Sequence, residues 1–201
     1  MDFIEKIREL SKKIEEQKSI VATEQAAKTA MVMPFLQLLG YDVFSASEVI
    51  PEYIADWGAK KGEKVDYAIK VGGRFVMLIE CKPVNDKLDA SKESQLARYF
   101  TNIPEARIGM LTNGIVYKFY TDLNEPNIMD TEPFMTFDFG QINERIAYKL
   151  EMFTKEKITN TDSVTSDIIK LRNYSATSEI IFKELTEPSE DFVRHIIKQL
   201  P

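Results

Sequence analysis

Residues 65–82 constrain the fold of this chain most strongly, because they have the pattern of two strands joined by a tight turn. VDYAIKV and RFVMLIECK are rich in β-branched and aromatic residues, and Gly72-Gly73 between them is a strong β-hairpin signal. The second run ends in Glu80, Cys81 and Lys82. Strand side chains alternate, so Glu80 and Lys82 share one face of the sheet while Cys81 points to the other.

The segments around this hairpin have the periodicity of helices and further strands. Residues 23–40 predict a helix with Thr23 as N-cap, a kink or break at Pro34 and an end at Gly40. Further helices are expected over 2–20, 90–102 (with Ser91 as N-cap) and 141–153, and strands over 41–51, 106–112, 115–122 and 134–139, the middle two joined by a type I′ turn at Asn113-Gly114. This order predicts an α/β domain with a mixed sheet flanked by helices.

A change of composition suggests two parts, a domain over 1–156 and a helical C-terminal extension over 157–201. TNTDSVTSD, residues 159–167, has the composition of a connector, and helical segments follow it. The abrupt end at Pro201 is compatible with truncation from a longer natural chain.

Composition excludes several classes of protein. The 201 residues hold a single cysteine, which excludes a disulfide framework or a multi-cysteine zinc site. No apolar run approaches the ~20 residues that span a bilayer, and the charged N-terminus has no signal-peptide core, so a cytoplasmic location is expected. The net charge of −6 counts against sequence-independent DNA binding by this chain alone, unless a metal or a local basic groove supplies positive charge.

The motifs that the sequence lacks exclude several kinds of catalytic site. The one histidine, His195, lies late in the chain, which argues against a Ser-His-Asp or Cys-His site, and we expect His195 to be a surface or packing residue of the C-terminal segment. GxSxG, GxxxxGK[ST] and GxGxxG are absent. The chemical groups that remain are carboxylates, lysines and backbone carbonyls. The oxygen atoms of the carboxylates and carbonyls suit a hard cation such as Mg²⁺.

Asp66 lies on the first strand of the hairpin and Glu80 on the second, so together they could hold a divalent ion. Lys82 could then orient water or neutralise developing charge. A plain two-residue turn, however, would pair Asp66 with Ile79 and turn Asp66 away from Glu80. The metal hypothesis therefore predicts a three-residue loop or a β-bulge.

The following helix adds Gln95 and Tyr99, which are four residues apart and share a helical face. Glu24, near the start of an earlier helix, is a further candidate metal ligand.

The spacing D-x13-E-x-K, followed by Q-x3-Y, resembles the PD-(D/E)XK nuclease superfamily. More closely, residues 20–140 resemble the N-terminal nuclease domain of type I restriction enzyme R subunits and related stand-alone bacterial and phage proteins. The segments that carry the resemblance are TEQAAKTAMVMPFLQLLGYDVF, KGEKVDYAI, LIECK, SQLARYF and LTNGIVYKFYTD. EPSEDFVRHII resembles the segment that follows in such proteins.

The resemblance implies a restriction-endonuclease-like fold that cleaves DNA with Mg²⁺, for which Mn²⁺ can substitute. It implies Asp66 and Glu80 as metal ligands, Lys82 as the catalytic lysine and Glu24 as the helical acid. Gln95 and Tyr99 match the auxiliary pair. Methyltransferase or specificity subunits, or another larger assembly, are implied as partners. Two departures are Val65 in place of proline before Asp66 and the absence of a translocating motor.

Each of these residues could instead have a role other than the catalytic one. Taken singly, Glu80 and Lys82 could form a solvated ion pair, and Asp66 could be a surface carboxylate. Cys81 could be a core residue or offer its carbonyl to the metal. The loop lysines and nearby aromatic residues could contact DNA or simply be loop residues: Lys60, Lys61, Lys64, Tyr53 and Trp57. The whole domain could also be a catalytically silent module that binds DNA or protein.

Overall fold

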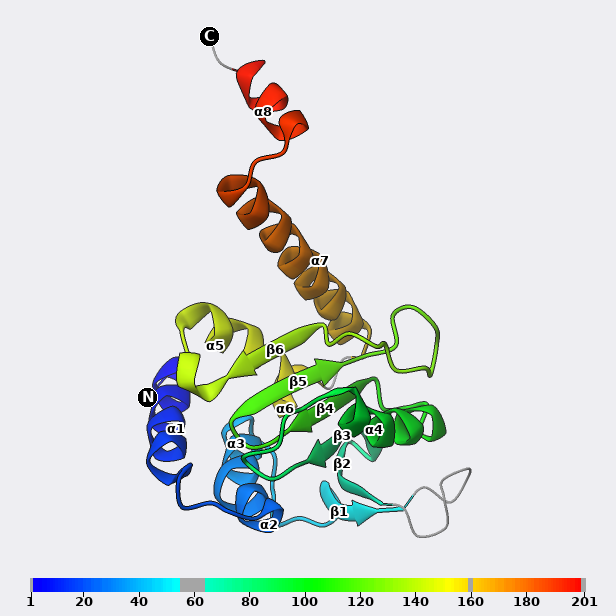
Figure 1. The fold of residues 1–201 in the computed structure, drawn as a ribbon. Helices are drawn as coiled ribbons and strands as arrows, with labels where there is room; N and C mark the ends of the chain where they lie inside the picture. The colour runs from blue at the N-terminus through cyan, green and yellow to red at the C-terminus, as the bar shows by residue number, and fades with distance from the viewer. Residues whose placement is uncertain (1, 55–63, 159–160, 200–201) are drawn as a thin grey trace.

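The computed structural model describes residues 2–54, 64–158 and 161–199, which form one mixed β-sheet flanked by helices and a helical arm (Figure 1). The α/β class expected from the sequence is confirmed. The six strands lie side by side in chain order: β1 Val49–Tyr53, β2 Val65–Val71, β3 Arg74–Cys81, β4 Ile108–Thr112, β5 Val116–Tyr120 and β6 Met135–Asp138.

All neighbouring strands are antiparallel except β3 and β4, which are parallel. A parallel pair needs a crossover connection, and helix α4 (Ala90–Asn102) provides it. The remaining α-helices are α1 Phe3–Gln17, α2 Glu24–Ala27, α3 Met33–Leu38, α5 Glu144–Leu150, α6 Lys155–Ile158, α7 Thr161–Thr186 and α8 Glu190–Ile197. A π-helical segment, Lys28–Val32, joins α2 to α3, and 3₁₀ turns lie at Phe139–Gln141 and Glu151–Phe153.

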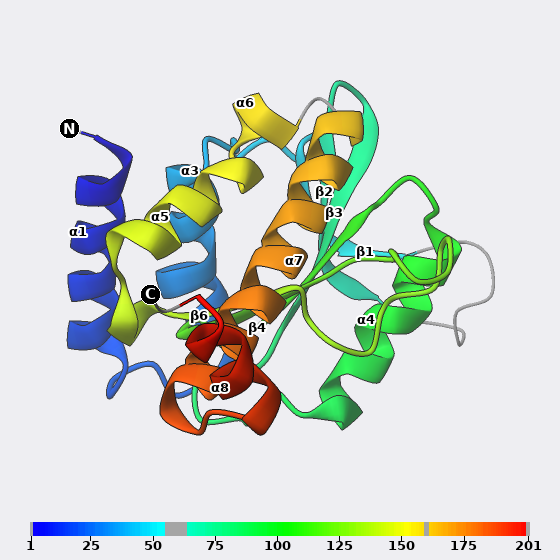
Figure 2. The ribbon, with the colours of Figure 1, turned by 90° about the horizontal axis from the view of Figure 1, so that it is seen from above.

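The sheet has an apolar cluster on each face. The larger one joins the sheet to α1, α3 and α5 and contains stacked aromatic rings such as Phe119 on Phe153, whose centroids are 4.1 Å apart. The smaller one joins the sheet to α4 and includes Leu78, Leu96 and Tyr99. Helices therefore cover both faces, as Figure 2 also shows from above.

The helical region of residues 24–38 is broken as predicted, and the break takes the form of the π-helical segment. Pro34 has no N–H with which to continue the i→i−4 ladder. Just before it, the Met33 N–H donates to the Lys28 carbonyl, five residues back. Thr23 caps the start through Ala26 N, and Gly40 adopts a positive φ of 93° after the end, also as predicted.

Two local predictions are wrong. Asp89, not Ser91, is the N-cap of α4, because its carboxylate accepts from Ser91 N and the helix begins at Ala90. The hairpin between β4 and β5 is present, but Asn113 has no positive φ, so the turn is not type I′. Instead the Asn113 side chain accepts from the Val116 N–H at 2.8 Å and closes a longer loop.

The predicted connector over 159–167 is also wrong where the structure describes it, because α7 begins at Thr161. Ile168 on α7 is buried in the large core cluster. Farther along α7, Ile180 and Phe182 are exposed, and Figure 1 shows this end of the helix, followed by α8, projecting from the sheet. The helical character of the extension thus agrees with the sequence, whereas its first turns pack on the domain.

No helix within residues 2–54, 64–158 and 161–199 is both long and apolar enough to span a membrane.

Candidate active site

The predicted irregularity in the hairpin is a β-bulge in β3. Val71 pairs with Arg74 across the Gly72-Gly73 turn, but Ile69 pairs with Met77, so β3 has one extra residue. Farther along, Tyr67 pairs with Ile79. The next residue on each strand is Asp66 and Glu80, and alternation places both on the face opposite the large core cluster. The bulge therefore gives the two carboxylates a common face.

Asp66 is held by two donors from different parts of the chain. Its Oδ2 accepts from the Cys81 backbone N–H at 2.6 Å, and its Oδ1 accepts from Lys28 Nζ at 2.5 Å. The first bond crosses from β2 to β3 and fixes Asp66 beside the end of β3. The side chain is 15% exposed, so a water or a ligand can still reach it.

Glu80 and Lys82 form a buried ion pair on the same face of β3. Lys82 Nζ donates to Glu80 Oε1 at 2.5 Å, and the two side chains are 13% and 3% exposed. Burial, together with the negative charge of Asp66, raises the pKa of Glu80 to about 7 despite the nearby ammonium of Lys82. Among the described residues, none donates a hydrogen bond to Glu80 Oε2. The pair thus contains a buried acceptor atom, Glu80 Oε2, without a hydrogen-bond donor among the described residues.

Lys28 is a site residue that the sequence analysis missed. Its ammonium donates to Glu24 Oε1 at 2.7 Å as well as to Asp66 Oδ1. Burial opposes its charge, but the bonds to Asp66 and Glu24 dominate and raise its pKa above the ordinary lysine value. The i, i+4 spacing of Glu24 and Lys28 was the available signal, but it did not reveal that Lys28 reaches the hairpin.

Glu24 is therefore near the site, but the ammonium of Lys28 lies between Glu24 and Asp66. Among the residues that the structure describes, no group of three His, Cys, Asp or Glu side chains is placed to hold a metal ion. The expected set of Glu24, Asp66 and Glu80 is not assembled here because Lys28 lies between the first two. Asp66 and Glu80 are the carboxylate pair that remains together.

Cys81 has its thiol in the large core cluster and is fully buried, in agreement with a core role. Burial and then the charge of Asp66 raise the pKa of the thiol, which therefore stays protonated. Its contribution to the site is the backbone N–H bound to Asp66. The use of its carbonyl as a metal ligand stays a prediction.

The auxiliary pair, Gln95 and Tyr99, lies on α4. Gln95 Nε2 donates to the backbone carbonyl of Lys64 at 3.0 Å, two residues before Asp66, so Gln95 ties α4 to the start of β2. Tyr99 is fully buried in the smaller core cluster. Both residues thus support the strands that carry the site.

The remaining residues that the sequence singled out either have surface or packing roles or lie outside the residues that the structure describes. Lys64 Nζ pairs with Glu52 Oε2 at 2.8 Å on the surface. The Tyr53 ring packs on Phe75, with centroids 5.0 Å apart. His195 is exposed on α8, which is one of the two placements expected for it. Trp57, Lys60 and Lys61 lie outside the described residues.

The donor set is suitable for a hard divalent cation. Two carboxylates share a face, and Glu80 has both a raised pKa and a buried oxygen that lacks a hydrogen-bond donor within the described chain. A cation between Asp66 and Glu80 would remove the charge repulsion that contributes to this pKa. Asp66 and Glu80 would hold such an ion, and Glu24 could join them if Lys28 moved away.

These features define the class of the molecule, an α/β domain whose hairpin presents two carboxylates and a lysine on one face of a mixed sheet. A family model described as type I restriction enzyme R protein N terminus matches residues 22–128, more than half of the chain. The chain belongs to this family.

The chain is similar in structure to part of a cryo-EM structure of a DrdV–DNA complex, with a TM-score of 0.47 and 16% identity. The match covers 73% of this chain and 14% of the other, so this chain spans a small fraction of that protein. A search of curated proteins finds no match.

Proposed function

We propose that this protein is a restriction-related nuclease that hydrolyses phosphodiester bonds of DNA with the help of Mg²⁺. The observation that carries the proposal is the β-bulge, because it gives Asp66 and Glu80 a common face and leaves Lys82 bound to Glu80. Membership of the type I restriction enzyme R protein N terminus family supports the same function.

The proposed roles follow from the contacts. Asp66 and Glu80 would hold the ion, which when bound would supply Lewis-acid chemistry for the hydrolysis. Lys82 orients the attacking water or neutralises charge that develops on the phosphate, because its ammonium is fixed beside Glu80. Gln95 holds the start of β2, which carries Asp66, and Tyr99 supports it from the core. Both therefore act as positioning residues.

The competing proposal is that the domain binds DNA or protein within a larger assembly without cleaving. The ammonium of Lys28 favours it, because this cation already neutralises Asp66 and Glu24 and would have to be displaced for a three-carboxylate metal site. Methyltransferase or specificity subunits are the proposed partners of such an assembly, and the cytoplasm is the proposed location.

Plasmid cleavage by the purified chain tests the enzymatic proposal. With Mg²⁺ or Mn²⁺ we expect nicking or cleavage of DNA, and we expect Asp66→Ala and Lys82→Ala each to reduce the rate by at least about 100-fold. Exposed Lys12 serves as the matched control, so Lys12→Ala should retain the rate. Cleavage by the purified Asp66→Ala, Lys82→Ala double variant would refute the proposal.

Calorimetric titration with Mn²⁺ separates the two functions. Saturable binding that is lost in Asp66→Ala, together with cleavage, supports the nuclease. A folded chain that neither binds Mn²⁺ nor nicks plasmid or single-stranded DNA belongs to the binding class. Thermal melting of each variant establishes that a lost signal does not come from unfolding.

A further inference from the structure

The turn between β4 and β5, residues 113–115, begins beside the end of the strand that carries the carboxylate site. The parallel pairing of β3 with β4 ends with Cys81 opposite Thr112. One residue farther, the Lys82 N–H donates to the Thr112 carbonyl at 2.8 Å. Asn113 is therefore the residue that follows the backbone partner of Lys82.

The buried side-chain amide of Asn113 bonds in two directions. Its Oδ1 accepts from the N–H groups of Ile115 at 3.1 Å and Val116 at 2.8 Å, both within the hairpin. Its Nδ2 donates to the carbonyls of Val84 and Asp86, both at 3.1 Å. A side-chain amide has two N–H donors and an oxygen with two lone pairs, so all four bonding positions are used. An aspartate could serve the turn in the same way but could not donate to the two carbonyls.

Those two carbonyls belong to residues 83–89, the loop that leads from Lys82 to α4. This loop is neither helix nor strand, so no ladder of backbone bonds fixes it. Its far end is also held by the hairpin, because Lys118 Nζ donates to the Leu88 carbonyl at 2.6 Å. The loop therefore takes its position from two side chains of the β4–β5 hairpin, and Asn113 is the one that acts next to Lys82.

The turn that carries Asn113 is itself fixed against the core. Gly114 has a φ of 87°, and a Cβ at this position would lie 2.8 Å from Met31 Sδ and 3.0 Å from Met31 Cβ. Met31 is fully buried in the large core cluster. The Thr112 hydroxyl accepts from the Gly114 N–H at 2.9 Å and donates to the Val116 carbonyl at 2.8 Å. Close packing and these bonds make the turn a firm base from which Asn113 can hold the loop.

We propose that Asn113 is a positioning residue of the carboxylate site, which holds the backbone after Lys82 so that the Lys82 ammonium stays beside Glu80. The inference rests on the nuclease function proposed above. A lysine side chain is a flexible four-carbon stem, so the place of its ammonium depends on how firmly its backbone is held. Lys82 lies where β3 ends, and the loop beyond it is the part that needs support. A displacement of about 1 Å at a reacting group can cost a factor of about 100 in rate.

Plasmid cleavage with saturating Mn²⁺ tests the kinetic consequence. Asn113→Asp keeps the acceptors of the turn and loses both donors to the loop, and Asn113→Ala checks that the added charge is not the cause. Each should lower kcat by at least about ten-fold and change KM by less than about two-fold, because Lys82 acts in the transition state. Tyr41→Phe is the matched control, since it removes a buried donor to the Phe153 carbonyl in the large core cluster and should retain kcat. Rates are compared at a temperature at which melting curves show every variant to be folded.

Hydrogen exchange followed by NMR in EDTA tests the structural step without any cleavage. The Lys82 N–H should exchange at least about ten-fold faster in both Asn113 variants than in the wild type, because the loop beyond it opens more often. The same amide should exchange at the wild-type rate in Tyr41→Phe. The Lys70 N–H, which donates to the Glu48 carbonyl at 2.8 Å in another part of the sheet, is the reference within each variant.

Three results would overturn the positioning role: a wild-type protein that cleaves while Asn113→Asp keeps its kcat, an unchanged exchange rate at Lys82, or an equal acceleration at Lys70 and Lys82. The last result would make Asn113 a residue of general stability. A wild-type protein that does not cleave contradicts the nuclease proposal instead, and the exchange rates then still decide whether Asn113 holds Lys82. The two failures are therefore distinguishable.

Discussion

One residue, Val76, decides the geometry of the carboxylate site. With an uninterrupted register, Asp66 would pair with Ile79 and face the large core, whereas the extra residue at Val76 pairs Tyr67 with Ile79 instead. The need for such an irregularity follows from counting residues between Asp66 and Glu80. Its form does not, because nothing in RFVMLIE distinguishes a bulge in β3 from a longer turn.

Glu80 should make stability depend on pH. Its folded-state pKa of about 7 lies above the ordinary value of 4.5, so the folded protein binds more protons than the unfolded chain between these pH values. Its contribution to the free energy of unfolding therefore falls as pH rises through this window, by roughly 3 kcal/mol. Glu80→Gln should lack this decrease, and urea denaturation in EDTA from pH 5 to pH 8 measures it.

The comparison uses the difference in unfolding free energy between Glu80→Gln and the wild type, which should grow with pH in favour of the variant. Glu16→Gln, a change at an exposed glutamate of α1, should give a difference that does not vary with pH. A constant difference for Glu80→Gln would mean that Lys82 compensates the Glu80 charge completely.

Lys28 should compete with metal for Asp66. Because its ammonium occupies one oxygen of Asp66 and one of Glu24, we expect Lys28→Gln to tighten Mn²⁺ binding by about ten-fold in calorimetric titration. Lys64→Gln removes a surface lysine paired with Glu52 and should leave the affinity unchanged. Weaker Mn²⁺ binding in Lys28→Gln would instead make Lys28 a supporting part of the site.

At the scale of elements, the π-helical segment before Pro34 matters for the site because it begins at Lys28, which binds Asp66. Glu24 and Lys28 lie on the turn where α2 passes into this segment. The sequence predicted the break from Pro34 alone, because a proline lacks the N–H that the ladder requires. Which backbone geometry would replace the ladder was decided by packing, since Met31 and Val32 within the segment are fully buried.

Helix α7 combines a packed start with an exposed end, so one substitution should have different effects along it. Ile168→Ala removes a side chain that is 1% exposed in the large core and should cost about 2–4 kcal/mol of unfolding free energy. Ile180→Ala, at 62% exposure, should change it by less than about 0.5 kcal/mol. Chemical denaturation of both variants measures the contrast, and equal losses would show that the distal part of α7 is buried in solution.

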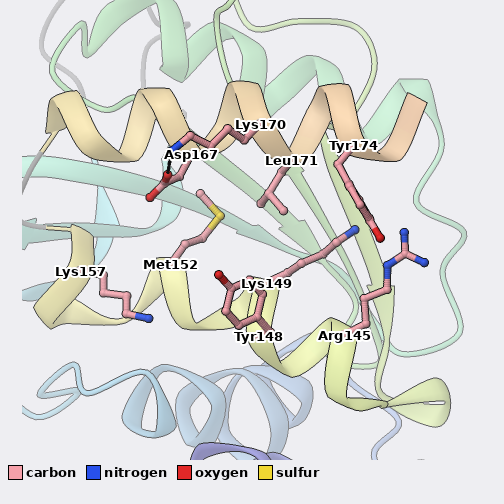
Figure 3. Close-up of a pocket in the computed structure, with 9 residues that line it drawn as sticks. All are labelled: Arg145, Tyr148, Lys149, Met152, Lys157, Asp167, Lys170, Leu171 and Tyr174. Carbon is pink, nitrogen blue, oxygen red and sulfur yellow. Dashed lines mark hydrogen bonds and ion pairs between the residues drawn. The ribbon is translucent and has the colours of Figure 1, made fainter. Parts of the chain in front are cut away.

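At the scale of the whole molecule, the carboxylate site and a pocket lined by both acidic and basic residues use different elements of one fold. The carboxylate site combines α2, the π-helical segment, β2 and the end of β3, and the pocket lies between α5 and α7 (Figure 3). The net charge of −6 could not reveal that acidic and basic residues lie in different parts of the fold, because a sum over the chain does not show where the charges are. Among the basic residues of the pocket, Arg145 and Lys149 form no motif in the sequence, since their shared partner, Tyr174, lies on another helix.

The sequence by itself determined the elements and the residue types of the candidate site. Sequence signals such as period-two and period-3.6 patterns, glycine pairs and the Thr23 cap act over a few residues. The hairpin, most helices and the succession of elements along the chain could therefore be predicted. The family resemblance likewise depended on local motifs. The errors at Ser91 and Asn113 concern single backbone angles and hydrogen bonds, which neighbouring residues leave open.

Only the tertiary structure decided which charged and polar groups are in contact. Lys28 reaches Asp66 across 38 residues of chain, and Gln95 bonds to the backbone carbonyl of Lys64, 31 residues before it. Contacts of this kind depend on how layers pack after the chain has folded, and side-chain spacing along one element does not encode them. Burial acts in the same way, because the raised pKa of Glu80 arises from desolvation by the packed domain and from a carboxylate on the neighbouring strand.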